Sequence, residues 1–358
     1  MSTINNKKEI LWINTLKGIC ILLVVLHHSI ITTLIPSIDH LSSGQLPAKL
    51  WLTFNKIVSP LRMPAFFFVS GLLAVKAINS KSWSEVFTSK VSNLLYLYIL
   101  WGLLQWFFIK GFISPIMESQ LSDSENSAYA ENIKEFSSLL AFAKTSLWYL
   151  YALAGYFLVA KLFFHFKYIL LAVAVTLNYC AALGIIEGWG IISIAQNMIY
   201  FLFGVFFSEE LVRATNVTKR NIFIWLAILT LAIININLGI GKNIFTCTLA
   251  IIISIIICKT LNNKFNLSWL NWIGKNTLQI YVIHRVVIEI IGVSSLNIGI
   301  DNGLFENTKI SLLWGVLFPL LDVAVCTSVS ILLWKILNNH IGKYLFLHPK
   351  LIKSPILK

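Results

Sequence analysis

Long apolar stretches separated by short polar segments repeat along the whole chain. Several of these stretches reach about 20 residues, the length at which an α-helix crosses the hydrocarbon core of a bilayer. The pattern predicts an all-α, polytopic membrane protein with about ten transmembrane helices and both termini in the cytoplasm. The predicted spans are 12–34, 50–75, 93–112, 147–160, 168–186, 191–207, 221–238, 243–258, 277–293 and 310–337.

The charges between the spans predict how the helices are oriented. Lys and Arg concentrate in the segments that this count places on the cytoplasmic side, which is the bias that sets the topology of membrane proteins. The net charge of +13 therefore indicates no nucleic-acid partner, because the basic residues are dispersed over short loops. The longest polar segment, 114–144, is acidic and falls outside, and we interpret it as solvated surface.

Composition agrees with this class of protein. Apolar residues make up 57% of the 358 residues and charged residues 12%, which excludes an ordinary soluble domain. The five cysteines fall within apolar segments without metal-ligand spacing, so we expect no metal. Sequons at Asn216 and Asn266 fall in predicted inner loops, which agrees with a bacterial plasma (inner) membrane. No repeat or linker divides the chain, so we expect one membrane domain over 1–358 with no appended soluble domain.

The first span carries a lysine near its start and two histidines near its end. Lys17 and His28 are eleven positions apart, which is three helical turns plus about 20°. Both side chains therefore leave the same face of the helix, about 16 Å apart along its axis. A cation and an imidazole on one buried stripe are costly unless they are used, so we interpret this stripe as functional. His27 points away from it, and we assign it no role.

Other ionisable residues lie inside the later spans. Arg285 and Glu289 are four residues apart and can neutralise each other, so a structural pair and a functional site both remain open. His284 lies at a depth comparable with that of His28, and two imidazoles at matching depth beside an arginine indicate a site. Asp322 needs a partner, for which Arg285 and Lys17 are both available.

The second span combines a buried cation with small and aromatic residues. Arg62 lies between two prolines, which are predicted to break the helix there and to favour a cavity-lining role over simple snorkelling. The aromatic run 66–68 is interpreted as packing. Ser70 and Gly71 form a small pair that permits close helix approach.

Four sequence blocks, in order along the chain, match a known pattern. They are INTLKGICILLVVLHHS with Lys17 and His28, MPAFFFVSGLLA with Ser70, LWYLYAL with Trp148, and IGKNTLQIYVIH with His284 at its end. The chain resembles, over nearly its whole length, the acyltransferase 3 family of integral-membrane acyltransferases. Lys17 stands where members of that family more often have an arginine.

The resemblance implies an acyl-CoA-dependent O-acyltransferase, most often an O-acetyltransferase that uses acetyl-CoA. The acyl group would pass from cytoplasmic acyl-CoA to a hydroxyl of a cell-surface polysaccharide or lipid-linked glycan, such as a capsule, exopolysaccharide or lipopolysaccharide. The expected partners are thus acyl-CoA, an envelope glycan or glycolipid, and membrane lipids.

The same resemblance implies roles for particular residues. His28 is the expected general base and His284 a second catalytic residue. Basic residues on the inner side would hold the CoA phosphates, namely Lys17, Lys76 and Lys90. The groups expected to orient the acceptor or to stabilise the oxyanion are Arg62, Ser70, Trp148 and Arg285.

A glycan or lipid transporter or flippase without acyl transfer is the alternative. Buried charges and broken helices also serve alternating access across a membrane. No internal repeat supports this alternative, and it does not need a cation and an imidazole on one face of the first span.

Overall fold

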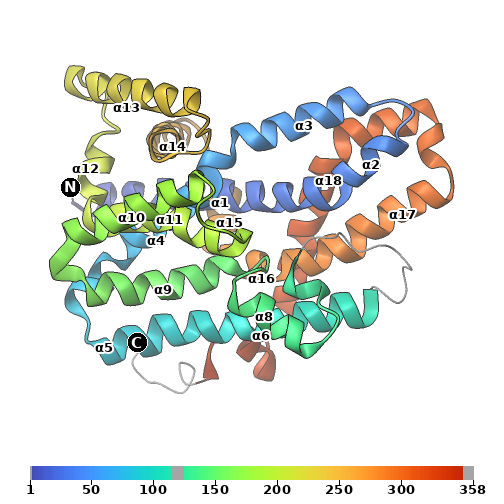
Figure 1. The fold of residues 1–358 in the computed structure, drawn as a ribbon, viewed down its shortest axis with the longest axis horizontal. Coiled ribbons are helices and arrows are strands. Elements are labelled where there is room, and N and C mark those ends of the chain that lie inside the picture. Colours follow the sequence, from blue (N-terminus) through green and yellow to red (C-terminus); the bar gives the residue numbers. More distant parts are fainter. Residues whose placement is uncertain (1, 114–124, 350–358) are drawn as a thin grey trace. The chain divides into compact units, whose positions relative to one another are not determined.

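The computed structural model describes residues 2–113 and 125–349, and every regular element within them is a helix (Figure 1). Nine helical stretches of the described residues are long and apolar enough to cross a membrane. A tenth, shorter apolar helix, Trp148–Leu162, occupies the position of the predicted fourth span. The predicted all-α, polytopic fold is therefore confirmed. The described part of the outer polar segment begins at Glu125.

The chain divides into two compact units, each assembled from three separate segments. The first unit comprises Met1–Cys20, Ser59–Tyr96 and Trp148–Thr277, and the second comprises Ile21–Val58, Leu97–Leu147 and Leu278–Lys358. We describe each unit by itself.

The first unit is built mainly from long apolar helices. Helix α1 (Ser2–Ser29) contributes its N-terminal part to this unit and runs without interruption past Lys17 to the two histidines. The other elements are α4 (Ser59–Ser80), α5 (Trp83–Val86), η3 (Phe87–Val91), α9 (Trp148–Leu162), η6 (Phe164–Phe166), α10 (Lys167–Ala182), α11 (Trp189–Phe206), α12 (Ser208–Arg213), α13 (Lys219–Asn237), α14 (Ile244–Lys264) and α15 (Ser268–Lys275).

Helices α4 and α11 pack closely because each presents a glycine to the other. A Cβ atom on Gly71 would lie 2.1 Å from the carbonyl oxygen of Phe201, and one on Gly204 would lie 2.1 Å from that of Phe68. Small residues permit such backbone contact between membrane helices. The prediction of close approach at Ser70-Gly71 is therefore confirmed.

The second unit contains several short and irregular helices. They follow α1 as η1 (Ile30–Leu34), α2 (Ile35–Ser37), η2 (Ile38–His40) and α3 (Gln45–Ile57). The later elements are most of α6 (Ser92–Phe108), η4 (Ile109–Ile113), η5 (Ser127–Tyr129), α8 (Ile133–Ala141), α16 (Thr277–Val287), η7 (Ile288–Val293), α17 (Ser294–Asp301), η8 (Leu304–Glu306), α18 (Thr308–Leu337) and η9 (His340–Leu345).

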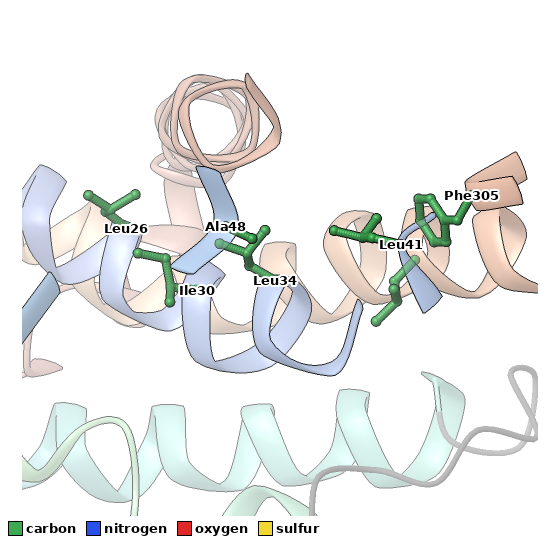
Figure 2. Packing of buried hydrophobic residues seen from close by; sticks show 7 residues of the cluster. Leu26, Ile30, Leu34, Leu41, Ala48 and Phe305 are labelled. Carbon is green, nitrogen blue, oxygen red and sulfur yellow. The ribbon is translucent and has the colours of Figure 1, made fainter. Parts of the chain in front are cut away.

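An apolar cluster supports the end of α1 within the second unit. Its side chains come from α1, η1, α3, α17, η8 and the turn before α3, and Figure 2 shows how they gather. Burial of this kind contributes about 25 cal/mol per Å² of apolar surface. The segment that follows the histidines is thereby anchored. The members of the cluster are Leu26, Ile30, Leu34, Leu41, Ala48, Leu296 and Phe305.

The predicted break of the second span at Pro60 and Pro64 is wrong. The interruption lies earlier, at Val58 between α3 and α4, and α4 continues through both prolines. Pro60 is the second residue of α4, where a backbone N–H would have no partner inside the helix. Pro64 lies inside α4, where a proline cannot donate a backbone hydrogen bond, and Arg62 lies between the two prolines on the continuous helix.

Replacing Gly71 by Ala should destabilise the protein, because the new methyl group would meet the backbone of α11. Overpacking of this kind costs about 1–3 kcal/mol, so the unfolding temperature in detergent should fall. Gly155→Ala in α9 is the matched control, since nothing lies within 4 Å of a Cβ there. The control should be neutral or slightly stabilising, because Ala favours a helix more than Gly does. Equal shifts in the two variants would contradict this account of the packing.

Candidate functional site

The rings of His28 and His284 meet inside the second unit. Their centroids are 5.1 Å apart, and the ring planes are inclined by 48°. His28 lies in the last turn of α1 and is partly exposed, whereas His284 lies on α16 and is fully buried. The structure thus brings together the two residues that the sequence placed at matching depth.

The His284 ring is held in one tautomer. Its Nδ1 lies 2.6 Å from the carbonyl oxygen of Tyr281, which can only accept, so Nδ1 carries a hydrogen and donates this hydrogen bond. Nε2 is then the unprotonated nitrogen of a neutral imidazole. Among the described residues Nε2 has no hydrogen-bond partner, so its lone pair is available. This arrangement suits His284 to accept a hydrogen bond.

A buried network of hydrogen bonds holds the helix that carries His284. The side-chain amide of Gln105 on α6 donates to the Val282 carbonyl at 3.1 Å, and its oxygen accepts from the Ser146 hydroxyl at 2.8 Å. The Tyr281 hydroxyl donates to the Ser146 carbonyl at 2.6 Å. These residues were not singled out from the sequence, because a lone Gln in an apolar span does not reveal its partners.

Next to His284, a charged pair is buried almost completely. Arg285 and Glu289 are 3% and 1% exposed, and their nearest N and O atoms are 2.5 Å apart. The ion pair that the four-residue spacing allowed is therefore present. Arg285 also donates to the Thr32 hydroxyl at 2.7 Å, which ties α16 to η1.

Tyr129 completes this network and corrects the interpretation of the outer segment as solvated surface. Its hydroxyl accepts from Arg285 and donates to Glu289. Burial raises the pKa of the Tyr129 phenol, although the nearby Arg285 opposes that rise, so the phenol stays neutral. Ser127 and Ala128, just before it, are buried too. The short apolar stretch around Tyr129 could have predicted this burial, but the acidic composition of the segment obscured it.

Asp322 on α18 lies in the same unit and is 4% exposed. Arg285, one of the two partners considered for Asp322, pairs instead with Glu289. Asp322 forms no ion pair among the described residues. Its carboxylate faces Gly292 of η7, where a Cβ would lie 3.4 and 3.5 Å from the two oxygens. Oδ2 has no hydrogen-bond partner in the described part of the chain. One turn further along α18, the Cys326 thiol contacts the carbonyl oxygen of His284 at 3.5 Å.

His27 lies beside His28, with the ring centroids 5.3 Å apart, and it has a further contact on α3. Its Nδ1 lies 3.1 Å from the Asn55 amide nitrogen of α3. This contact joins α1 to α3, which gives His27 a structural role.

The remaining predicted site residues belong to the first unit. Arg62 is 9% exposed, so it does not simply snorkel to the surface. Ser70 hydrogen-bonds the Tyr149 hydroxyl at 2.6 Å, and the Trp148 ring packs 5.7 Å from that of Phe67. The predicted packing role of the aromatic run is confirmed, since its three phenylalanines are buried.

The predicted donor lysines differ in exposure. Lys17 is partly buried on α1, whereas Lys76 on α4 and Lys90 in η3 are exposed. A different residue, Lys161, donates to the carbonyls of Ile78 and Lys81, both at 2.7 Å, and so stabilises the end of α4.

Lys242 is a further basic residue that the sequence reasoning missed. It lies in the turn between α13 and α14, and burial lowers the pKa of its ammonium group. Cys247 opposes this fall in pKa, and the charge of Arg62 adds to it. Over the described residues, no group of three or more His, Cys, Asp or Glu side chains could hold a metal ion.

Apolar helices that carry imidazoles and a buried ion pair define a polytopic membrane protein with a polar site inside its helices. The family model described as an acyltransferase domain matches residues 10–336, and the chain belongs to this acyltransferase 3 family. It is 32% identical over 360 residues to the inner membrane protein YcfT of Escherichia coli (strain K12), an alignment that covers 96% of this chain and 98% of that protein. No solved structure matches the chain significantly.

These comparisons confirm the family that the four sequence blocks indicated. Together with the apolar helices, they identify a multi-pass protein of the bacterial inner membrane. It is thus a membrane protein of an acyltransferase family.

Replacing Glu289 by Gln should strongly destabilise the protein, because it leaves the Arg285 charge buried without a counter-charge. The expected cost is about 3–5 kcal/mol, seen as a lower unfolding temperature in detergent. Replacing both residues, as in Arg285→Met with Glu289→Leu, should restore much of this loss.

The exposed pair Arg213–Glu209 provides the control, because it has the same four-residue spacing and side chains 73% and 79% exposed. Glu209→Gln should cost no more than about 1 kcal/mol. A similar loss in the two single variants would show that burial is not what makes the Arg285–Glu289 pair important.

Proposed function

We propose that the protein transfers an acyl group, most simply acetyl, from cytoplasmic acyl-CoA to a hydroxyl of a cell-surface polysaccharide or lipid-linked glycan. The observation that carries this proposal is the close pair of His28 and His284, one ring accessible and one buried. Membership of the acyltransferase 3 family supports the type of reaction. The acetyl donor and the glycan acceptor are the finer parts of the proposal.

His28 acts as the general base. As the acceptor hydroxyl attacks the thioester carbonyl, the neutral imidazole takes the hydroxyl proton. The C–S bond of the tetrahedral intermediate then breaks, and the imidazolium returns the proton to the departing CoA thiolate. The products are an ester and free CoA, so atoms and charge balance without a metal or an acyl-enzyme.

His284 assists by accepting a hydrogen bond at Nε2. A neutral imidazole has one N–H, and that of His284 already hydrogen-bonds a backbone carbonyl. The ring therefore has no N–H left for an oxyanion. Arg285, which belongs to the same unit as His28 and His284, is the group proposed to stabilise the oxyanion or to orient the acceptor. Its Nε has no hydrogen-bond partner among the described residues.

The donor approaches from the Lys17 end of α1. CoA carries several phosphate charges, and lysine side chains bind phosphate oxygens through charge-assisted hydrogen bonds. Lys76 and Lys90 are exposed and thus accessible to such a ligand. Lys17 and His28 lie on one uninterrupted helix, α1.

His28→Ala should abolish acylation of the envelope glycan, with a rate at least about 100-fold lower, because a positioned base contributes about 10²–10⁴-fold. The measurement is mass spectrometry of envelope glycans from cells that make each variant at equal membrane levels. His27→Ala is the neighbouring control, and it should retain acylation although it loses the Asn55 contact.

Glycan export should remain intact in the His28→Ala cells. A loss of export together with acylation would favour the transporter alternative. Full acylation by His28→Ala would remove this histidine from the mechanism.

Lys17→Met should raise the KM for acyl-CoA more than it lowers kcat, because the lysine binds the donor and does not take part in proton transfer. Steady-state kinetics of the purified protein with varied acetyl-CoA measure this effect. Lys56→Met at the exposed end of α3 is the control for removal of a positive charge. A change confined to kcat, with KM unaltered, would contradict the donor-binding role.

A further inference from the structure

Tyr129 joins the buried charged pair from a part of the chain that is distant in sequence. It belongs to η5 in the outer segment, 156 residues before Arg285 and 160 before Glu289. The tyrosine side chain is partly exposed, whereas both charged side chains are buried. The outer segment thus contributes a side chain to the helix that carries His284, next to the proposed reaction centre.

The partners of Arg285 hold both terminal nitrogens of its guanidinium group. Nη1 donates to the Thr32 hydroxyl at 2.7 Å, and Nη2 contacts the Tyr129 hydroxyl and the Glu289 carboxylate. The guanidinium carbon Cζ also lies 5.5 Å from the centroid of the Tyr129 ring. Nε, in contrast, has no hydrogen-bond partner among the described residues. Because a guanidinium group is planar and rigid, fixing its terminal nitrogens also fixes the direction of the Nε–H bond.

Neutralisation of Arg285 does not require the tyrosine. Glu289 lies one turn away on the same chain segment and supplies the counter-charge by itself. The Tyr129 hydroxyl adds a neutral donor to the carboxylate oxygen that Arg285 contacts. A carboxylate that accepts a second hydrogen bond is stabilised by it and depends less on the cation. The phenol therefore weakens the hold of Glu289 on the positive charge of Arg285.

The chain around Tyr129 is fixed by its own contacts. The Trp106 indole of α6 donates to the Ala130 carbonyl at 2.7 Å. Ala128 packs with Ile109 in a small apolar cluster, against which Tyr129 also packs. The phenol is thus held in place before any ligand arrives, and such preorganisation is what makes a polar group effective in catalysis.

We propose that Tyr129 is a positioning residue of the transfer reaction, which holds Arg285 so that its Nε–H is available to the reacting oxygen. The inference rests on the proposed function, in which Arg285 stabilises the oxyanion or orients the acceptor. It assigns part of that task to the outer segment. The phenol exchanges no proton with the substrate, because its hydroxyl already accepts from Arg285 and donates to Glu289.

Tyr129→Phe removes the hydroxyl and keeps the ring. The assay uses the purified full-length protein, acetyl-CoA as donor, and a glycan extract from cells that lack the protein as acceptor. The variant should lose about tenfold in kcat, because misdirection of a catalytic group slows the reaction. The KM for acetyl-CoA should not change, since none of the lysines proposed to bind the donor contacts the phenol. The unfolding temperature in detergent should fall only slightly, because the Arg285–Glu289 pair remains.

Tyr98→Phe is the matched control. The Tyr98 hydroxyl donates to the Leu140 carbonyl at 2.6 Å, so it anchors the same outer segment to α6 at a different point. This variant should show a similar fall in unfolding temperature with kcat unchanged. Equal losses of kcat in the two variants would mean that both tyrosines merely hold the segment in place, and would overturn the inference.

A double variant tests whether the tyrosine acts through the arginine. Arg285→Lys keeps a counter-charge for Glu289 but loses the planar fork, so kcat should fall while the protein still folds. Adding Tyr129→Phe should then cause no further loss, because no fork is left to position. Losses in kcat that multiply would show that Tyr129 acts independently of Arg285, which overturns the positioning role.

The outcomes also separate this inference from the proposed function. Full kcat in Tyr129→Phe, together with acyl transfer that His28→Ala abolishes, overturns the role of Tyr129 and leaves the proposed function in place. A raised KM for acetyl-CoA with unaltered kcat also overturns that role, since it would assign the phenol to donor binding. Absence of acyl transfer by the unaltered protein rejects the proposed function, and this inference with it.

Discussion

The buried pair of Arg285 and Glu289 is the interaction on which the second unit depends. A charged side chain inside a bilayer is costly unless another charge neutralises it. Arg285 also contacts Thr32 and Tyr129, so the neutralised side chain connects α16 to η1 and to the outer segment. The adjacent His284 is thereby placed on a fixed helix beside the accessible His28.

Irregular helices accompany this site. The π-helical segments η1 and η7 follow the two helices that carry His28 and His284, and they contact each other within the second unit. Single π-helical turns within α-helices occur often at functional sites. Gly292 lets η7 approach the Asp322 carboxylate, so a buried acid lies in the unit that contains both imidazoles.

The two histidines differ in a way that suits different tasks. His28 is partly exposed, as a residue that must meet a substrate needs to be, whereas His284 is sealed and held in one tautomer by a backbone carbonyl.

The sequence by itself determined the helical membrane class, the family, and the stripe of Lys17 and His28, because length, hydropathy and helical period are local properties. It also allowed the Arg285–Glu289 pair, since that contact spans one turn of one helix. Only the tertiary structure decided that Tyr129 joins this pair, that Gln105 supports α16, and that Asp322 is not paired with Arg285. These contacts join residues far apart in the chain, whose meeting depends on helix packing and not on spacing. The break before Arg62 lies at Val58, just before the Ser59–Pro60 start of α4, whereas the helix continues through the interior Pro64.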